Sequence, residues 1–221
     1  MIDYKLIEKF VINLKRRPDR LKIFQEICPL NDVNIIHGFD GYNLSEENEK
    51  ETELFAKIPL KFPGEIGCFI SHLRIYQTIV KDNIPYALIM EDDAIFTKYF
   101  IVKFLNILRQ LSSTTDIVFI GGRFTPDYHM KSCDKITANI VKHKVMNNKY
   151  IGKPIDFHRT THAYLISNNM ANIFLNTFHS TKVHTQIDHW ILDVCKNNSI
   201  PVYNTQPLLC HSPIVHDSDI R

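Results

Sequence analysis

Short apolar runs alternate with amphipathic segments along this chain of 221 residues, and the alternation limits the folds available to it. Runs typical of buried strands occupy 9–14, 33–42, 85–91, 116–122 and 161–167. Segments with apolar residues at helical spacing occupy 17–28, 64–83, 98–111, 168–178 and 188–198. Because strands that alternate with helices form a sheet covered on both faces, we expect an α/β sandwich with a mostly parallel sheet.

Three other segments complete this outline. Residues 43–59 are polar and charged, which predicts an exposed loop with helical turns. Residues 123–154 are polar and irregular, which predicts a loop or a hairpin excursion, and residues 200–205 predict an edge strand. The length fits a single domain over 1–221.

The charge and the cysteines argue against several classes of protein. A net charge of +2 does not favour nucleic acid or an anionic membrane as partner. The five cysteines are widely spaced and form no CxxC pair, so we expect neither a disulfide framework nor a thiolate zinc site. The chain shows no transmembrane run, no signal peptide and no retention tail. We therefore expect it in the cytoplasm or at the inner face of a membrane, and its oligomeric state stays open.

The strand predicted at 85–91 leads into three consecutive acids, Glu91, Asp92 and Asp93. Ligands of α/β proteins bind beyond the carboxyl ends of strands, which is where these acids fall. Alternation would put Glu91 and Asp93 on one face and Asp92 on the other. Buried carboxylates are costly without a cation, and oxygen ligands suit Mg²⁺ or Mn²⁺. An alternative stays open, in which the acids only cap the following helix.

Several motifs, in order, resemble one family. They are VINLKRRPDR (11–20), GEIGCFISHLRIYQTIV (64–80), ALIMEDDAIF (87–96), THAYLISNNMANIFL (161–175) and IDHWIL (187–192). In this order and spacing they resemble glycosyltransferase family 25, the group of lipooligosaccharide galactosyltransferases and collagen glycosyltransferase domains. The resemblance runs from residue 10 to the SDI at 218–220.

The resemblance implies a GT-A fold, which is a nucleotide-sugar-binding α/β sandwich with a mixed, mostly parallel central sheet. It implies a UDP-sugar donor, Mn²⁺ or Mg²⁺ as cofactor, and transfer with inversion at the anomeric carbon. Glu91, Asp92 and Asp93 stand in the place of the family's DxD-like metal motif. The donor-binding half would span about 9–122 and the acceptor-side half about 123–221.

Basic and amide side chains near the end of the first predicted strand are candidates for donor binding. In a GT-A fold this loop faces the nucleotide, which assigns Asn13 and Arg17 to the donor, and Arg20 lies three residues beyond Arg17. We interpret Lys15 and Arg16 as a solvated basic face.

The helix predicted at 64–83 supplies three further candidates for the donor or its sugar. Its N-terminus offers free N–H groups, and Glu65 can bind a sugar hydroxyl. Ser71 and His72 lie one to two turns further on. For His72 a buried, hydrogen-bonded core histidine is the competing interpretation.

The C-terminal half supplies the remaining candidates. An inverting transferase needs a general base, and the resemblance assigns Asp188 to that role, although it also suits a helix N-cap. His211 is a candidate fourth metal ligand, in a place where many family members carry Gln. The HRTTH at 158–162 has zinc-helix spacing but precedes a strand, so we interpret it as a chance match that leaves His162 facing the acceptor. Trp190 is interpreted as core.

The leading hypothesis is a metal-dependent, inverting transferase that moves galactose or glucose from UDP to a hydroxyl of a glycan or of a hydroxylysine-type protein. Two alternatives remain. One is a metal-dependent phosphoester or pyrophosphate hydrolase, which leaves the N-terminal motif without a role. The other is a degenerate family member that binds a glycan or a partner without turnover.

Overall fold

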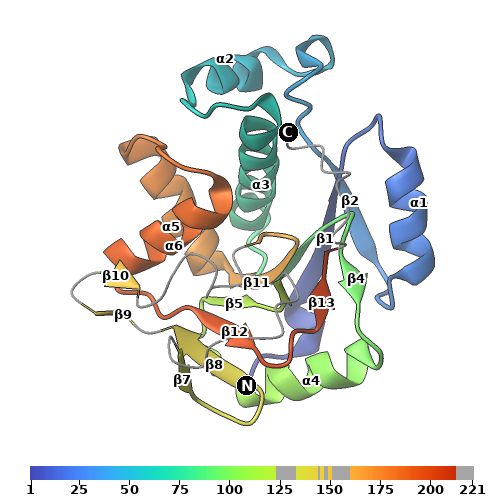
Figure 1. Cartoon of the computed structure of the whole chain (residues 1–221), viewed down its shortest axis with the longest axis vertical. Coiled ribbons are helices and arrows are strands. Elements are labelled where there is room, and N and C mark those ends of the chain that lie inside the picture. Colours follow the sequence, from blue (N-terminus) through green and yellow to red (C-terminus); the bar gives the residue numbers. More distant parts are fainter. Residues whose placement is uncertain (123–132, 144, 147–148, 151–159, 213–221) are drawn as a thin grey trace.

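The computed structural model describes residues 1–122, 133–143, 145–146, 149–150 and 160–212. An eight-stranded sheet forms its centre, in the order β2-β1-β3-β11-β5-β12-β8-β7 (Figure 1). The strands are β1 (Ile7–Asn13), β2 (Val33–His37), β3 (Tyr86–Glu91), β5 (Ile117–Phe119), β7 (Cys133–Lys135), β8 (Ile140–His143), β11 (Ala163–Ser167) and β12 (Tyr203–Thr205).

Most strands of this sheet point the same way. β1 is parallel to β2 and β3, and β5 is parallel to β12. β11 runs against β3 and β5, and β8 runs against β12 and β7. The prediction of an α/β sandwich with a mostly parallel mixed sheet is confirmed. β11 lies between β3 and β5, so the sheet interleaves strands from both halves of the sequence.

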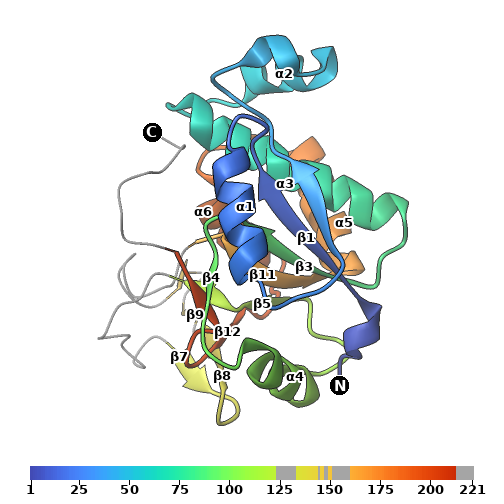
Figure 2. The ribbon, with the colours of Figure 1, turned by 90° about the vertical axis from the view of Figure 1, so that its right-hand side faces the viewer.

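Helices cover both faces of the sheet, as the views in Figures 1 and 2 show. The helices are α1 (Pro18–Ile27), α2 (Glu49–Lys57), α3 (Pro63–Lys81), α4 (Phe100–Gln110), α5 (Asn168–Ser180) and α6 (Ile187–Asn197), with 3-10 turns η1 (Tyr4–Leu6) and η2 (Leu44–Glu46). α3, α5 and α6 share one buried cluster with the sheet, and α1 and α4 share the other. In the described part of the chain, no helix is both long and apolar enough to cross a membrane.

Alternation along β3 explains why its sequence is apolar throughout. Ala87 and Ile89 belong to the core on the α3 face, whereas Leu88 and Met90 belong to the core on the α1 and α4 face. All four side chains are fully buried. A strand buried on both faces lacks the polar alternation of a half-exposed strand, and its first exposed positions lie at its ends.

Local signals in the sequence set several helix ends. Pro18 and Pro63 occupy the first turn of α1 and α3, where the missing N–H costs nothing. Ser167 accepts a hydrogen bond from the Met170 amide and so caps α5. α3 places its N-terminal half beside the carboxyl end of β3, which positions the candidate site.

The structure corrects three details of the sequence-based outline. The strand within 200–205 is internal, because β12 pairs with β5 on one side and with β8 on the other. The segment 43–59 contains the helix α2, which is capped by Asn48, in place of a loop. The strand at 33–42 ends at His37. The hairpin expected within 123–154 is present as β7 and β8, although much of that segment lies outside the described residues.

Two smaller sheets complete the fold. β13 (Cys210–His211) lies between β4 (Ile95–Phe96) and β6 (Gly121–Gly122), antiparallel to β4 and parallel to β6. β9 (Val145–Met146) and β10 (Lys149–Tyr150) form an antiparallel pair. β4 and β13 bring the C-terminal part of the described chain next to the segment that follows the acidic triplet.

Candidate active site

The three acids form a turn at the carboxyl end of β3. The Ala94 amide donates to the Glu91 carbonyl at 3.1 Å, and the Asp92 amide donates to the Ile12 carbonyl of β1 at 3.2 Å. The first bond closes the turn on itself, and the second ties the turn to β1. The predicted position at the end of a central strand is therefore correct, and the acids do not cap α4, which begins at Phe100.

A pocket lies between this turn, the start of α1, the loop after β2 and the N-terminal half of α3, and we call it the α3–β3 pocket. Its lining residues are Ile12, Leu14, Arg16, Arg20, Phe39, Asp40, Gly41, Tyr42, Gly64, Cys68, Ser71, His72, Glu91, Asp92 and Asp93. The pocket is polar where the acids and arginines meet and apolar toward Ile12 and Phe39. It gathers residues from four separate stretches of sequence.

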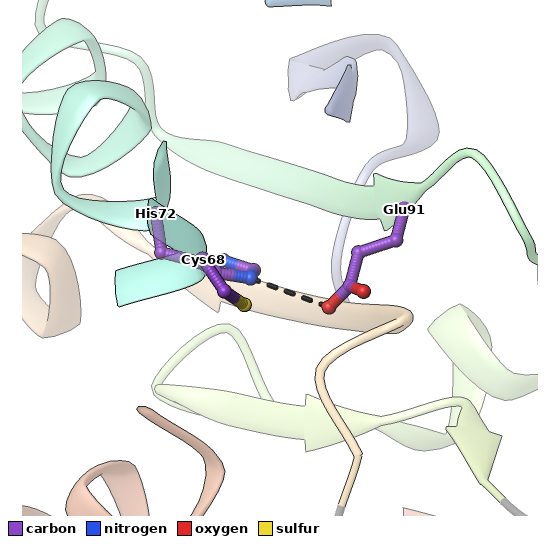
Figure 3. A group of neighbouring side chains, drawn as sticks. All are labelled: Cys68, His72 and Glu91. Atoms are coloured by element: carbon purple, nitrogen blue, oxygen red, sulfur yellow. Dashed lines mark ion pairs between the residues drawn. The ribbon is translucent and has the colours of Figure 1, made fainter. Parts of the chain in front are cut away.

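Glu91 points into this pocket from the end of β3. Its Oε1 accepts a 2.5 Å hydrogen bond from Thr161 Oγ1 and lies 3.4 Å from His72 Nε2 (Figure 3). Burial alone would raise the pKa of this carboxyl, but His72 and Thr161 hold it down to about 2. Glu91 is therefore ionised at neutral pH.

Asp92 is held by two neighbours. Asn13 Nδ2 donates to Asp92 Oδ2 at 2.6 Å and also to the Arg17 carbonyl at 2.9 Å. Arg20 Nη2 forms an ion pair with Asp92 Oδ1. Both oxygens of this carboxylate are thus engaged, and only 8% of its side chain is exposed. Asp92 is placed to orient Arg20.

Asp93 has an oxygen that needs a partner. Its Oδ1 is buried and has no hydrogen-bond partner within the described structure, and its Oδ2 lies 3.7 Å from Arg20 Nη2. Burial raises the pKa of Asp93 to about 7, and the Glu91 charge adds to this, while Arg20 opposes it. A nearby cation would satisfy this oxygen and favour the ionised form.

His72 sits fully buried on α3, between the pocket and a pair of tyrosines. Its Nδ1 lies 2.7 Å from the Tyr164 hydroxyl, which in turn lies 2.7 Å from the Tyr76 hydroxyl. Its Nε2 faces Glu91 but has no hydrogen-bond partner in the part of the chain that is described. His72 is thus a buried, hydrogen-bonded core histidine that also lines the pocket, and its role in binding the donor or its sugar stays a prediction.

Of the three arginines at 16, 17 and 20, the structure places Arg16 and Arg20 in the pocket lining but not Arg17. Arg16 is exposed, as expected for a solvated basic face, and it also lines the pocket and donates from Nε to Asp40 Oδ2 at 2.6 Å. Arg17 pairs with Asp19 at 3.0 Å and does not line the pocket. Neighbours in sequence diverge here because Arg17 lies at the N-cap of α1. The donor roles of Asn13, Arg17 and Arg20 stay predictions.

The remaining α3 candidates have structural contacts. Ser71 lines the pocket, donates to the Gly67 carbonyl at 2.6 Å and accepts from the Phe39 amide at 2.8 Å. Glu65 accepts a 3.0 Å hydrogen bond from Gln186, which precedes α6. Both therefore hold elements together, whatever they bind, and their sugar-binding roles stay predictions.

Asp188 lies in the first turn of α6, outside the pocket lining. It is half-buried, and its Oδ1 accepts from the His189 amide at 2.8 Å. Its charge acts on the Cys68 thiol and so contributes to raising the pKa of that thiol, after burial and Glu91. The residue before α6, Gln186, contacts Glu65 of α3, which places the start of α6 against α3. The role of Asp188 as a base stays a prediction.

The structure also gives the positions of His211, His162 and Trp190. His211 lies in β13, opposite Ile95 of β4, and its metal role stays a prediction. His162 directly precedes β11, and its Nε2 lies 3.1 Å from the Gly122 carbonyl; part of the HRTTH motif lies outside the described residues. Trp190 is buried against Phe69 and Phe174, which confirms the core interpretation.

The donor atoms in the pocket fit a hard divalent cation. Glu91 is an ionised carboxylate, and Asp93 presents an unpartnered buried oxygen. Carboxylate oxygens are the ligands that Mg²⁺ and Mn²⁺ prefer. Two contributors to the site, Cys68 and Thr161, were not found from the sequence. Cys68 stands one helical turn before His72, a spacing that places both on one face of α3 and was available as a signal.

Comparison with known proteins gives one family. The sequence model of glycosyltransferase family 25 (LPS biosynthesis protein) matches residues 6–191. A glycosyltransferase 25 family member from Drosophila melanogaster is 32% identical over 126 residues, which is 52% of this chain and 21% of that protein. Procollagen galactosyltransferase 2 from Homo sapiens is 30% identical over 151 residues, which is 60% of this chain and 23% of that protein.

The chain spans about a fifth of the length of these curated relatives. Among solved structures, the inositol-1-phosphate CTP transferase from T. maritima aligns with 97% of this chain and 91% of its own, with a TM-score of 0.48 and 13% sequence identity.

Proposed function

This chain belongs to glycosyltransferase family 25, and we propose that it transfers a hexose from a UDP-sugar to an acceptor hydroxyl with a bound divalent cation. The observation that carries the proposal is the acidic turn at the carboxyl end of β3. All three of its acids line a pocket that is also lined by Arg16 and Arg20. Acids for a metal ion beside arginines for a diphosphate are the groups that a nucleotide-sugar requires.

Glu91 and Asp93 are the proposed metal ligands, with Mn²⁺ or Mg²⁺ as the ion. Asp92 is assigned to holding Arg20, because Arg20 and Asn13 already occupy its two oxygens. When bound, the ion would neutralise charge on the diphosphate leaving group. Arg20 and Arg16 would bind phosphate oxygens, and Asn13 would keep Arg20 in place through Asp92.

The proposed reaction is a single displacement at the anomeric carbon. The acceptor hydroxyl loses its proton to the carboxylate of Asp188, and its oxygen forms the new bond to that carbon. The bond to the diphosphate oxygen breaks, and UDP leaves with the electron pair. Attack from the face opposite UDP inverts the configuration. Support for Asp188 comes from its place in the first turn of α6, because the residue before that helix, Gln186, contacts Glu65 of α3.

Galactose is the first sugar to test, with glucose as the alternative. The relative from Homo sapiens is named a procollagen galactosyltransferase, and the family is described by LPS biosynthesis. Both names are compatible with a hydroxyl acceptor on a protein or on a glycan. The acceptor is proposed only at that level of chemistry.

The test is UDP release from UDP-galactose, UDP-glucose and other UDP-sugars, measured with Mn²⁺ and with a chelator. The variants are Glu91→Gln and Asp93→Asn, each compared with Asp82→Asn. Asp82 is an exposed acid at the opposite end of α3, so its variant controls for the loss of one charge. We expect Mn²⁺-dependent release from one donor, lost in the two pocket variants and kept in the control.

Three results would contradict the proposal. Release of UMP and sugar phosphate would point to a pyrophosphate hydrolase. Activity that survives in both pocket variants would remove the acids from the site. No release from any donor, together with no Mn²⁺-dependent UDP binding by calorimetry, would point to a degenerate binding protein.

A further inference from the structure

A second set of metal-ligating atoms lies on the α3 side of the acidic turn. Sγ of Cys68, Nε2 of His72 and a carboxylate oxygen of Glu91 all lie within 4.8 Å of one another. Figure 3 shows the thiol and the imidazole leaving the same face of α3 and pointing toward Glu91 at the end of β3. Among the described residues, no other group of three such side chains comes this close together.

We propose that Cys68, His72 and Glu91 form a binding site for one thiophilic divalent cation of the Zn²⁺ class. A thiolate, an imidazole and a carboxylate are the three kinds of protein ligand that Zn²⁺ takes, and Mn²⁺ and Mg²⁺ do not favour the sulfur. This site is distinct from the oxygen site of Glu91 and Asp93, although Glu91 belongs to both. The wide spacing of the cysteines predicted no thiolate zinc site, whereas this set combines one thiol with a histidine and a carboxylate that are brought together by the fold.

The Nε2 atom of His72, which faces Glu91 without forming a hydrogen bond to it, points to an ion at this place. Nε2 is fully buried and has no hydrogen-bond partner in the described structure, which is costly for an imidazole. Its distance to Glu91 Oε1 is 3.4 Å, longer than the roughly 2.7–2.9 Å of a direct charge-assisted hydrogen bond. Two ligands of a tetrahedral Zn²⁺, bonded at about 2.0–2.1 Å, lie about 3.3 Å apart.

Neighbouring side chains orient two of the three ligands. A Nδ1–H on His72 that donates to the Tyr164 hydroxyl at 2.7 Å leaves the Nε2 lone pair free for the metal. The Tyr164 hydroxyl can in turn donate a hydrogen bond to the Tyr76 hydroxyl, which lies 2.7 Å away. Thr161 donates to Glu91 Oε1. Such outer contacts accompany most metal-ligating histidines and carboxylates.

The three side chains leave room for a fourth ligand from the α3–β3 pocket, because all of them line it. Binding replaces the Cys68 S–H bond by a sulfur–metal bond and releases one proton to solvent. No oxidant or reductant is involved. An ion bound here would occupy Glu91 and withdraw it from the oxygen site.

The first experiment titrates the purified chain with Co²⁺ and reads absorption. Co²⁺ replaces Zn²⁺ and reports a bound thiolate by near-ultraviolet charge transfer, with intense visible bands when it is tetrahedral. We expect one Co²⁺ per chain with the thiolate band, displaced by Zn²⁺. Cys68→Ser should lose the band, whereas Cys28→Ser, a change at another half-buried free cysteine, should keep it.

His72→Gln should weaken Co²⁺ binding by about tenfold or more, because it removes one ligand. A measurement on the unaltered chain guards against misfolded variants. Zn²⁺ should protect Cys68 from alkylation by iodoacetamide, read by peptide mass spectrometry, and should leave Cys28 reactive. A thiolate band that persists in Cys68→Ser, Co²⁺ bound without any thiolate band, or an unprotected Cys68 would each overturn the site.

A functional consequence rests on the proposed transferase activity. One equivalent of Zn²⁺ should inhibit Mn²⁺-dependent UDP release in the wild-type chain, and Cys68→Ser should be about tenfold less sensitive. If the transferase proposal fails, the Co²⁺ spectrum and the alkylation result still decide the metal site. If the thiolate band is absent but UDP is released, only the metal site fails.

Discussion

Asn13 at the end of β1 donates a 2.6 Å hydrogen bond to Asp92 in the acidic turn, across 79 positions of sequence. The same carboxylate forms an ion pair with Arg20, so an amide and a guanidinium share it. Asn13 is 2% exposed and also donates to the Arg17 carbonyl. One buried amide therefore joins β1, the loop before α1 and the turn that carries the acids.

Replacing Asn13 tests this arrangement. Asn13→Ala removes the donor to Asp92 and should lower the free energy of unfolding by about 1–3 kcal/mol. Asn13→Asp should be worse at neutral pH, because it puts a second carboxylate against Asp92 in a buried place. Urea unfolding at about pH 7.5 measures both. An Asp variant as stable as the wild-type chain would show that the hydrogen bond does not order the turn.

Arg74 should control the stability of α2 more than that of the whole fold. Its Nε and Nη2 bind the two oxygens of Glu51 at 2.6 and 2.7 Å, and Nη2 also binds Glu47. A two-point guanidinium–carboxylate contact cannot be reproduced by Lys. Arg74→Lys should therefore speed amide hydrogen exchange in Glu49–Lys57, with little change in the exchange of β3.

A matched change separates this effect from the loss of any surface charge pair. Lys57→Ala removes an exposed pairing with Glu53 at 3.9 Å in the same helix, and such pairs contribute little. It should leave the exchange of α2 near the wild-type rate. Equal exchange in Arg74→Lys and in the wild-type chain would show that α2 is held by its apolar contacts alone.

The sequence was sufficient to predict the α/β architecture and the position of the three acids at the end of β3. β3 is buried on both faces, so its apolar run and polar end were visible in the residues themselves. The internal position of β12 was not predictable, because it depends on whether β8 pairs beyond it, and that pairing joins positions about 60 residues apart. α2 was missed because its sequence has few apolar residues to mark a buried face, and no residue of the helix is fully buried.

The candidate site was likewise predictable only where local sequence determines the position of a residue. The acids begin at the last residue of β3, so their place at the end of the strand was a local property of the sequence. Asp92 and Asp93 lie in the turn beyond β3, where strand alternation no longer applies, and all three acids line the pocket instead of facing opposite sides. The pairing of Arg16 with Asp40 was not predictable, because Asp40 belongs to the loop after β2 and nothing near Arg16 in the sequence indicates it. Thr161 reaches Glu91 from the segment before β11 in the same way. Contacts between distant segments are set by topology rather than by local pattern.

Asp93 should make the metal-free chain less stable as pH rises. Its pKa is 3.8 as a free side chain and about 7 when folded, mainly because of burial and then because of Glu91. Between these values the unfolded chain releases the proton while the folded chain keeps it, so stability falls as pH rises from about 4 to 7 and is level above. Asp93→Asn should remove this loss.

The expected gain for Asp93→Asn near pH 8 is on the order of 1–2 kcal/mol, reduced from the full shift because 31% of the side chain is exposed. Near pH 4 the gain should vanish. Chemical unfolding with a chelator present measures it, with the exposed Asp82→Asn as control. Parallel stability curves for the wild-type chain and Asp93→Asn would contradict the raised pKa.

Gly67 should tolerate no side chain, although it lies inside a helix. Alanine is normally more favourable than glycine there by about 1 kcal/mol. A Cβ at Gly67 would lie 2.6 Å from the Phe39 carbonyl oxygen and 3.1 Å from the Gly41 amide nitrogen. Both are backbone atoms, so no flexible side chain can move aside.

We expect Gly67→Ala to lower the free energy of unfolding by about 1–3 kcal/mol, as overpacking does, in place of the helix-propensity gain. Gln77→Ala, on the exposed face of the same helix, should change it by less than about 0.5 kcal/mol. Because Phe39 and Gly41 line the α3–β3 pocket, Gly67→Ala should also weaken UDP binding by calorimetry. A stabilised variant with unchanged binding would mean that the loop after β2 does not lie against α3 in solution.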